Sequence, residues 1–275
     1  MAKYEIIGKS KLNGKIKVAG NKNSVLPIMA AALLTKGTTT LENVPNISDV
    51  DVMSQLLELT GAKIQRNENS TLTITTNDIN PATFPNNLTA KLRAAVLLLG
   101  PMLARTGSLT MGHPGGDLIG KRPLETHIQA LQSLGATIAA KDDHYEASAD
   151  KLKGAYIFLK EASVTATENV IMAAVLAEGE TVIKRAASEP HVVDLCKFLV
   201  KMGAKIDGIG SNLLKITGVE ELQPTTHKIA PDHIEVGTFA ILAAVTEGEI
   251  EIENIEKDDL DMILSVLSDF NVNFE

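Results

Sequence analysis

The chain has 275 residues, of which 44% are apolar, enough to form one large or two modest packed domains. Its formal net charge of −8 argues against a nucleic-acid partner, because binding to a phosphate backbone needs a clustered cationic face. One cysteine excludes an internal disulfide framework, and neither a signal peptide nor a membrane-spanning run is recognisable. We therefore expect a soluble, cytoplasmic protein with neither nucleic-acid nor membrane partners.

Four times along the chain, an apolar helix-like run ends in a small-residue turn and enters a short β-like stretch. These turns contain Gly61, Gly135, Gly203 and, in a degenerate copy, Asn271. Successive turns are 74, 68 and 68 residues apart, which is too long for a solenoid repeat. Each unit is therefore predicted to be a small α/β module.

Each module also has a first half, in which an alanine-rich apolar helix leads through a turn into a strand. These first halves are expected at 24–41, 89–111, 167–183 and 234–252. Helices so rich in alanine are expected to be buried on nearly all sides.

The remaining segments suggest how the modules are grouped. Short strands are expected at 4–7 and 14–18, where they could return to pack with the fourth module, and the turn-rich segment 220–232 is expected to be a linker. We therefore predict two domains. Residues 21–230 would form a first domain of three α/β repeats, and residues 1–20 together with 231–275 would form an incomplete second domain.

Three segments carry a resemblance to a known family. They are 19–28 (AGNKNSVLPI), 114–123 (PGGDLIGKRP) and 231–239 (PDHIEVGTF). Together and in this order they closely resemble the UDP-N-acetylglucosamine 1-carboxyvinyltransferases, which are enolpyruvyl transferases with 3-phosphoshikimate 1-carboxyvinyltransferase as a sister. The resemblance covers essentially the whole chain, whereas the family continues for roughly another third.

The resemblance implies an enolpyruvyl-transferase-like, inside-out α/β barrel built of repeated α/β units. One three-repeat domain would be complete, the second would be incomplete, and substrates would bind in the cleft between the two. Because an incomplete domain leaves an apolar face exposed, self-association through that face is also expected.

The activity implied by the resemblance is transfer of the enolpyruvyl group from phosphoenolpyruvate to the 3-hydroxyl of UDP-N-acetylglucosamine. This is the first committed step of peptidoglycan synthesis, and so bears on cell wall biogenesis, cell shape, cell division and the cell cycle. No cofactor is implied, and the six histidines and one cysteine show no metal-binding spacing.

Two alternatives to this activity remain. Without the last third of the family, the chain is expected to be weakly active or inactive, so a non-catalytic UDP-sugar-binding or regulatory fragment is the main alternative. Activity on 3-phosphoshikimate is disfavoured, because the Pro-Gly-Gly loop belongs to the sugar-nucleotide branch.

The predicted catalytic residues are Asp117, Lys22 and Arg122, with Asp117 and Arg122 on the catalytic loop 112–123. Asp117 stands where most relatives carry Cys, and the resemblance makes it the general acid, a role that requires a pKa raised toward neutrality. Lys22 and Arg122 would hold the anionic groups of the substrates. The alternatives are a solvated turn aspartate, a surface lysine and an arginine in a loop–surface ion pair.

The same resemblance assigns the substrate-binding residues. They are Lys22, Asn23, Arg93, Arg122, Pro123, Leu124, Glu125, His127, Ser163, Val164 and Thr165. Thr165 replaces the usual Gly and could crowd the diphosphate, Glu125 replaces the commoner Asp, and His233 stands where relatives often have Arg. For Arg93 the alternative is a helix-end side chain that lies along the surface, and for His127 it is a structural residue.

Three further residues carry predictions that do not depend on substrate binding. Asp232 and Glu235 are expected either to position a hinge or to cap a helix. Cys196 is expected to be a helix-packing residue.

Overall fold

The computed structural model describes residues 3–5, 8, 10–116, 120 and 122–275. The chain divides into two compact units. The continuous unit is Lys22–Ile229, and the split unit combines Met1–Asn21 with Ala230–Glu275.

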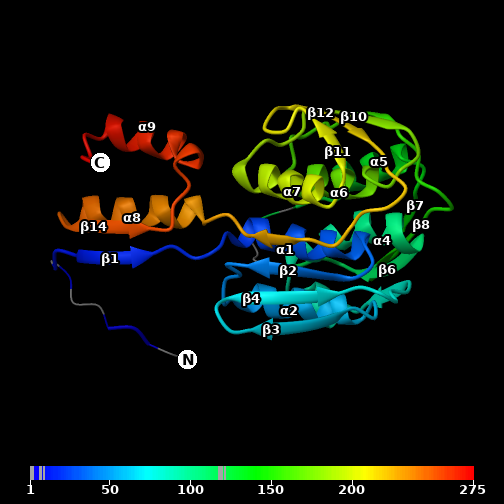
Figure 1. The fold of residues 1–275 in the computed structure, drawn as a ribbon, viewed down its shortest axis with the longest axis horizontal. Coiled ribbons are helices and arrows are strands. Elements are labelled where there is room, and N and C mark those ends of the chain that lie inside the picture. Colours follow the sequence, from blue (N-terminus) through cyan, green and yellow to red (C-terminus); the bar gives the residue numbers. More distant parts are fainter. Residues whose placement is uncertain (1–2, 6–7, 9, 117–119, 121) are drawn as a thin grey trace. The chain divides into compact units, whose positions relative to one another are not determined.

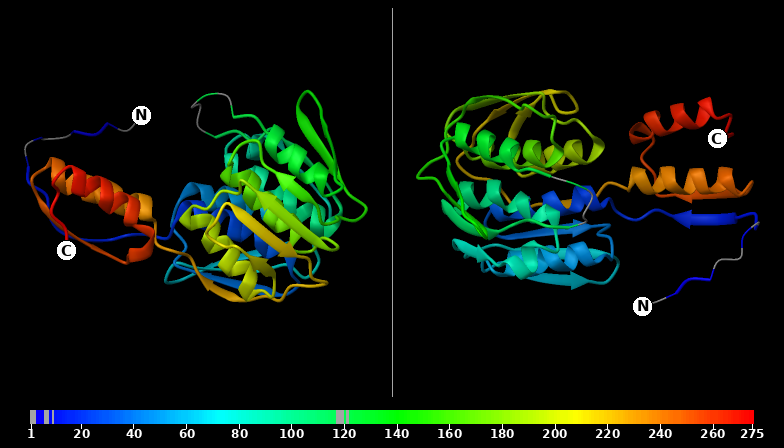
Figure 2. Two further views of the ribbon diagram at one scale, coloured as in Figure 1. Left: turned by 90° about the horizontal axis from the view of Figure 1, so that it is seen from above. Right: turned by 180° about the vertical axis from the view of Figure 1, so that it is seen from behind.

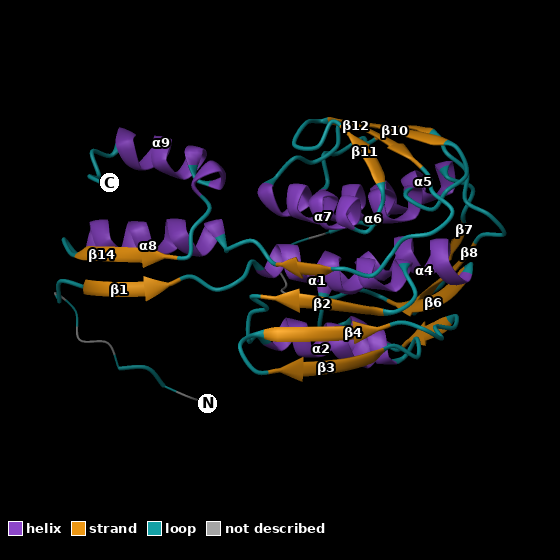
Figure 3. Ribbon diagram, viewed as in Figure 1, coloured by secondary structure: helices purple, strands orange, loops and turns teal. Residues whose placement is uncertain are grey.

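The described part of the continuous unit contains three mixed sheets of four strands each (Figure 3). The first sheet has the order β13 (Thr226–Lys228), β2 (Thr38–Glu42), β4 (Thr71–Thr75) and β3 (Lys63–Asn67). The second has the order β5 (Ala82–Phe84), β6 (Ser108–Gly112), β8 (His144–Ser148) and β7 (Thr137–Ala140). The third has the order β9 (Tyr156–Phe158), β10 (Glu180–Lys184), β12 (Leu213–Thr217) and β11 (Lys205–Asp207).

The three sheets share one pattern of strand directions. In each, the first strand is parallel to the second, and the remaining pairs are antiparallel. The parallel edge strand always arrives from the sheet that precedes it in the chain, since β5 follows β4, β9 follows β8 and β13 follows β12. The chain therefore links the three sheets in a closed cycle.

Strand β13 was not predicted. The prediction of a plain linker at 220–232 was wrong for Thr226–Lys228, which pairs with β2 in register Thr226↔Thr40. His227, in the middle of this strand, is buried, whereas its two neighbours are exposed. Three alternating residues among prolines and threonines are too short a pattern to recognise as a strand from sequence.

Helices of the continuous unit pack between and against these sheets (Figure 1). They are α1 (Lys22–Ala31), the 3₁₀ turn η1 (Ala32–Leu34), α2 (Ser48–Glu58), α3 (Asn86–Thr89), the 3₁₀ helix η2 (Arg93–Leu98), α4 (Leu99–Thr106), α5 (Glu125–Ser133), α6 (Val164–Ala174) and α7 (Pro190–Lys201). From its third residue onward, every residue of α1 and of α6 is buried, which confirms the expectation for the alanine-rich helices. Cys196 of α7 is buried in the same core, as expected for a packing residue.

The helix expected within 89–111 is not continuous. The segment forms α3, then η2, then α4, and a break lies between the last two. At this break the Asn169 carboxamide, from α6, donates from Nδ2 to the Val96 carbonyl at 3.1 Å and accepts at Oδ1 from the Gly100 N–H at 2.8 Å. A regular α-helix would join Gly100 N–H to Val96 C=O, so the Asn169 side chain takes the place of that bond.

The close fit at the break also explains why residue 100 is glycine. A Cβ atom at Gly100 would overlap the backbone carbonyl oxygen of Asn169. The next residue, Pro101, has no N–H to donate, which favours the break at this point. Asn169 Nδ2 also donates to the Thr165 carbonyl at 3.1 Å, so one buried side chain ties α6 to both η2 and α4.

The split unit contains a two-stranded parallel sheet, β1 (Asn13–Lys17) with β14 (Glu249–Glu253), together with α8 (His233–Val245), the 3₁₀ turn η3 (Lys257–Asp259) and α9 (Asp261–Asp269). The opening strand therefore returns to the fourth module, as expected. The strand expected at 4–7 is not seen at residues 4–5, and residues 6–7 lie outside the described residues.

Helix α8 departs from the expectation of burial on all sides. Only Val236 and Gly237 of this helix are buried, although its composition is strongly apolar. The described split unit offers few apolar partners, since its core centres on Val18, Val236 and Leu260. Large apolar side chains of α8 and α9 are therefore exposed, among them Ile241, Val245, Met262 and Phe270.

Asp232 caps α8, which confirms one of the two roles expected for it. Its Oδ1 accepts from the Ile234 N–H at 3.0 Å and from the Glu235 N–H at 3.3 Å. The Glu235 carboxylate accepts in turn from the Ala19 N–H at 2.9 Å. None of the helices described is long and apolar enough to cross a membrane.

Replacing Asn169 with Ala should destabilise the protein by about 1–3 kcal/mol, because the buried Gly100 N–H would be left without a partner, whereas the Val96 carbonyl would keep the Leu99 N–H as a donor. Denaturant unfolding of the variant and the parent measures this difference. As a control, the same substitution at the exposed Asn77 should change stability by no more than about 0.5 kcal/mol. A loss at Asn169 no larger than at Asn77 would contradict this account of the helix break.

Candidate active site

A pocket of about 300 Å³ lies where the first turns of α1, α6 and α7 meet. We call it the helix-end pocket, and it is lined by Asn23, Leu26, Pro27, Ala94, Leu97, Arg122, Val164, Thr165, Glu168, Glu189 and His191. Each helix N-terminus carries N–H groups that have no partner within the helix, and roughly half a positive charge. The pocket therefore combines three positive helix ends with the Arg122 side chain, an arrangement that favours an anionic ligand.

Four of the predicted site residues, Asn23, Arg122, Val164 and Thr165, line this pocket together. They come from two helices and a loop that are far apart in the sequence.

The other predicted residues have different surroundings. Lys22, the first residue of α1, is half exposed, and its Nζ lies 3.4 Å from Asp49 Oδ2. Ser163 is the N-cap of α6, where its Oγ accepts from the Ala166 N–H at 3.3 Å. Leu124 is buried in the core, whereas Pro123 and Glu125 are exposed beside it.

The Arg93 side chain donates hydrogen bonds to carbonyl groups at both ends of the loop 112–123. One guanidinium nitrogen, Nη2, donates to the Arg122 carbonyl at 2.6 Å and to the Pro123 carbonyl at 3.5 Å, and Nη1 donates to the Pro114 carbonyl at 3.4 Å. Burial, and then the nearby Arg122 charge, lowers the pKa of Arg93 from its ordinary value. The Arg93 side chain thus joins the two ends of the loop.

The first end of the loop is also fixed by the backbone. The Gly115 N–H donates to the Thr89 carbonyl at 2.9 Å, and the Gly116 N–H donates to the Ala90 carbonyl at 3.0 Å. A Cβ atom at Gly115 would overlap the Ala90 carbonyl, so this approach requires glycine. Asp117, the predicted general acid, follows Gly116 in the sequence and lies outside the described residues.

His127 does not line the pocket itself but contacts Thr165, which does. Its side chain is buried, and its Nε2 lies 2.8 Å from Thr165 Oγ1, so it holds one of the residues that line the pocket. Burial, and then the charge of Arg93, lowers the pKa of His127 from 6.5 to about 4. The imidazole is therefore neutral near pH 7 and positions Thr165 through a hydrogen bond, which matches the structural alternative for this residue.

Sequence reasoning missed Glu168, Glu189 and His191 of the pocket lining. Glu168 is 1% exposed, and its Oε1 has no hydrogen-bond partner among the described residues. Burial, and then the neighbouring Glu189, raises the pKa of the Glu168 carboxyl well above its ordinary value. The sequence signal was a charged residue inside an alanine-rich helix that we had already expected to be buried.

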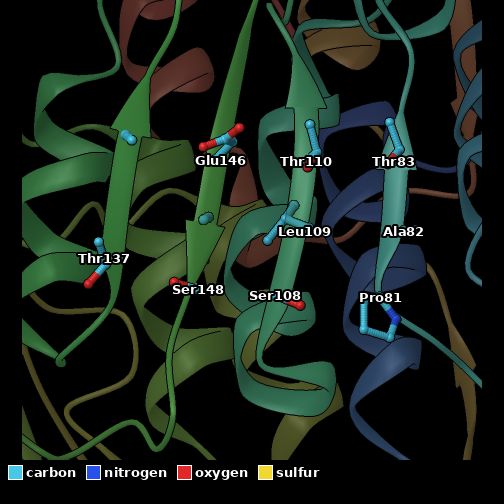
Figure 4. A pocket seen from close by; sticks show the side chains of 11 residues that line it. Pro81, Ala82, Thr83, Ser108, Leu109, Thr110, Thr137, Glu146 and Ser148 are labelled. Atoms are coloured by element: carbon cyan, nitrogen blue, oxygen red, sulfur yellow. The ribbon is translucent and has the colours of Figure 1, made fainter.

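A second hollow, of about 380 Å³, lies on the sheet of β5, β6, β8 and β7 and contains none of the predicted site residues. Thr83, Thr110 and Glu146 lie side by side across neighbouring strands there (Figure 4). The hollow is an open, polar sheet surface.

A family model described as EPSP synthase (3-phosphoshikimate 1-carboxyvinyltransferase) matches residues 6–275. The chain belongs to the EPSP synthase family. Within this enolpyruvyl transferase family it resembles proteins named UDP-N-acetylglucosamine 1-carboxyvinyltransferase. The one from Treponema denticola is 49% identical over 260 residues, which are 94% of this chain and 61% of the relative.

A second such relative, from Borreliella burgdorferi, is 49% identical over 275 residues, which are 100% of this chain and 64% of the relative. The predicted resemblance is therefore confirmed. The chain spans less than two thirds of the length of these relatives.

Solved structures show the same mixed α/β fold. The enolpyruvyl transferase NikO from Streptomyces tendae has a TM-score of 0.75 at 22% identity, covering 85% of this chain and 55% of that one. An EPSP synthase from Acinetobacter baumannii has a TM-score of 0.76 at 22% identity, covering 96% of this chain and 60% of that one. Figure 2 shows the corresponding sheets and helices of this chain from two further sides.

The pKa values of two histidines should be shifted in opposite directions from the ordinary value of 6.5. His127 should remain neutral until the pH falls to about 4, whereas hydrogen bonds to Asp143 and Glu146 raise the pKa of the more exposed His144 above 6.5. The unfolded chain gains a proton at His127 near pH 6.5 and the folded chain does not, so this residue should reduce stability as the pH falls from about 6.5 to about 4. Histidine NMR titration measures both values, and a His127 signal that titrates near 6.5 would contradict its buried, neutral state.

Proposed function

We propose that the protein acts in transfer of the enolpyruvyl group from phosphoenolpyruvate to the 3-hydroxyl of UDP-N-acetylglucosamine. The observation that carries the proposal is the convergence of Asn23, Arg122, Val164 and Thr165 on one pocket at three helix N-termini. Both substrates carry phosphoryl groups, which suit such a pocket. The names of the 49%-identical relatives support the choice of substrates.

In this proposal the reaction proceeds by addition and elimination. The Asp117 carboxyl gives a proton to the methylene carbon of phosphoenolpyruvate while the sugar hydroxyl attacks the neighbouring carbon and loses its own proton to a base, forming a tetrahedral ketal. A base then removes a proton from the new methyl group, and the C–O bond to phosphate breaks, so that the double bond forms again and phosphate leaves. Arg122, Lys22 and the helix N-termini would stabilise the phosphoryl charge during both steps. No metal or organic cofactor takes part in this scheme.

The proposed substrates define the cellular role. The product would feed peptidoglycan synthesis, and hence cell wall biogenesis, cell shape and cell division. Because both substrates are water-soluble anions, we propose that the protein acts in the cytoplasm. The enolpyruvyl-transferase barrel would be completed by the part of the relatives' length that residues 1–275 do not span.

The second candidate function is a binding or regulatory fragment that holds the UDP-sugar without turning it over. It rests on the helix-end pocket alone, because Asn23, Arg122, Val164 and Thr165 suit an anionic ligand whether or not turnover follows. In both candidates residues 1–275 bind UDP-N-acetylglucosamine, and the two differ in whether phosphate is released.

Calorimetry should show UDP-N-acetylglucosamine binding to residues 1–275, and Arg122→Ala should weaken it about tenfold or more, because a charge-assisted hydrogen bond to phosphate is lost. Arg66→Ala is the matched control, since Arg66 lies on β3 and pairs with Asp51 away from the pocket. In a parallel assay, phosphate release from phosphoenolpyruvate should be weak or undetectable. Absence of binding would refute both candidates, and turnover at the rates of intact enzymes would refute the fragment.

We also propose that residues 1–275 self-associate through the split unit. Ile241 and Val245 of α8 are 55% and 72% exposed, and Met262 and Phe270 of α9 are each 77% exposed. So many large apolar side chains on two helices mark an interaction surface. Burying such side chains between two copies would stabilise a dimer by about 1.5–3 kcal/mol each.

Sedimentation velocity should therefore show dimers or larger species of residues 1–275. The double substitution Ile241→Glu and Val245→Glu should weaken association at least about tenfold. Tyr156→Ser removes a side chain that is 63% exposed on β9 of the continuous unit, and it should leave association unchanged. Monomers at all concentrations, or equal effects of both changes, would contradict this surface.

A further inference from the structure

The floor of the helix-end pocket contains a carboxyl group that the proposed reaction does not use. Glu168 lies in the second turn of α6, four residues after Val164, so the two side chains lie on the same helix face. Glu168 lines the pocket, yet it is 1% exposed, and its Oε1 has no partner among the described residues. A buried polar atom without a partner costs about 1–3 kcal/mol, so its position in a ligand-sized pocket calls for an explanation.

The surroundings of Glu168 favour the neutral form of its carboxyl group over the charged form. Burial disfavours the charged form, and the carboxylate of Glu189, at the N-cap of α7, opposes a second negative charge nearby. Cys196, on the same helix α7, stays a neutral thiol, because burial, with Glu168 next, raises its pKa to about 12. The other titratable groups of the pocket and its wall are Arg122, His191 and the neutral His127.

A neutral carboxyl group differs from a carboxylate in having an O–H to donate. A metal ion is not the expected partner, because no group of three or more His, Cys, Asp or Glu side chains suited to a metal occurs among the described residues. The three helix N-termini and Arg122 instead favour an anion. An ionised Glu168 would place two carboxylates at the pocket and repel that anion, whereas a protonated Glu168 adds a donor.

We propose that Glu168, in its protonated form, donates a hydrogen bond from the floor of the helix-end pocket to a phosphoryl oxygen of the ligand. The pocket then accepts a tetrahedral oxyanion only while Glu168 holds its proton, and it loses the ligand as the pH rises and Glu168 ionises. The inference rests on the proposed function for the identity of the ligand, but the chemistry of the site follows from the pocket residues themselves.

Sulfate is a suitable probe because it is tetrahedral and its charge does not change across the neutral and alkaline range. NMR titration of the Val164 and Thr165 amide signals should show saturable sulfate binding that weakens as the pH rises. Glu168→Gln, which keeps a donor and cannot ionise, should bind sulfate with no such pH dependence. Glu168→Met, which fills similar space without a donor, should bind sulfate about tenfold or more weakly.

Glu161→Gln is the matched control, since Glu161 is exposed outside the pocket and should leave the parent behaviour unchanged. Thermal unfolding of each variant checks that it is folded. Absence of sulfate binding to the parent, equal binding by Glu168→Met, or the same pH dependence in Glu168→Gln as in the parent would each overturn the inference.

Competition distinguishes this inference from the proposed function and identifies the source of the phosphoryl group. Displacement of sulfate by UDP-N-acetylglucosamine or by phosphoenolpyruvate would identify which substrate Glu168 contacts. If sulfate binding depends on Glu168 but neither substrate displaces sulfate, the role of Glu168 in oxyanion binding would stand and the proposed substrates would be wrong. If Glu168→Met binds the substrates as strongly as the parent protein does, the proposed function would stand and the proposed role of Glu168 would be wrong.

Discussion

The Asn169 carboxamide is the interaction on which the rest of the continuous unit depends. It replaces a helix hydrogen bond between Val96 and Gly100 and holds the break between η2 and α4 against α6. The same two segments provide Ala94, Leu97 and Glu168 to the lining of the helix-end pocket. A single buried side chain thus sets the distance between two walls of the site, and its three hydrogen bonds leave it little freedom to move.

Local charge, not net charge, makes the site suitable for an anion. The chain carries −8 overall, yet the pocket receives three helix N-termini and Arg122. Screening limits the reach of distant surface carboxylates to about 8–10 Å, so groups within the pocket dominate. Glu189 is the exception, since it lies at the pocket and reduces its positive potential.

Much of the fold follows from sequence patterns, because these patterns report burial. Alanine-rich runs indicated α1 and α6 as buried helices, and the repeated small-residue turns indicated an α/β architecture. Other features depend on contacts that no local pattern contains. The break before α4 requires Asn169, strand β13 requires an available edge on β2, and the exposure of α8 depends on what the rest of its unit supplies.

In the candidate site, too, some features could be predicted from the sequence and others depend on contacts between distant segments. Family resemblance was enough to select Asn23, Arg122, Val164 and Thr165, which meet at one pocket. It could not indicate that the donors of Arg93 are taken up by loop carbonyls, because that depends on the path of the loop. Glu168 was also missed, because a glutamate in a helix is ordinarily exposed and only the packing around α6 shows that this one is not.

The closed cycle of sheets has a consequence for how such a protein can be rearranged. The chain enters the continuous unit after Asn21 and leaves it before Ala230, and the Asn21 N–H donates to the Ala230 carbonyl at 2.8 Å. The two ends of this unit are therefore neighbours, and the whole unit behaves as an insert within the split one. Domains with adjacent ends can be moved between hosts or reopened at a surface loop without rebuilding their interior, so evolution and engineering can treat residues 22–229 as a transferable module.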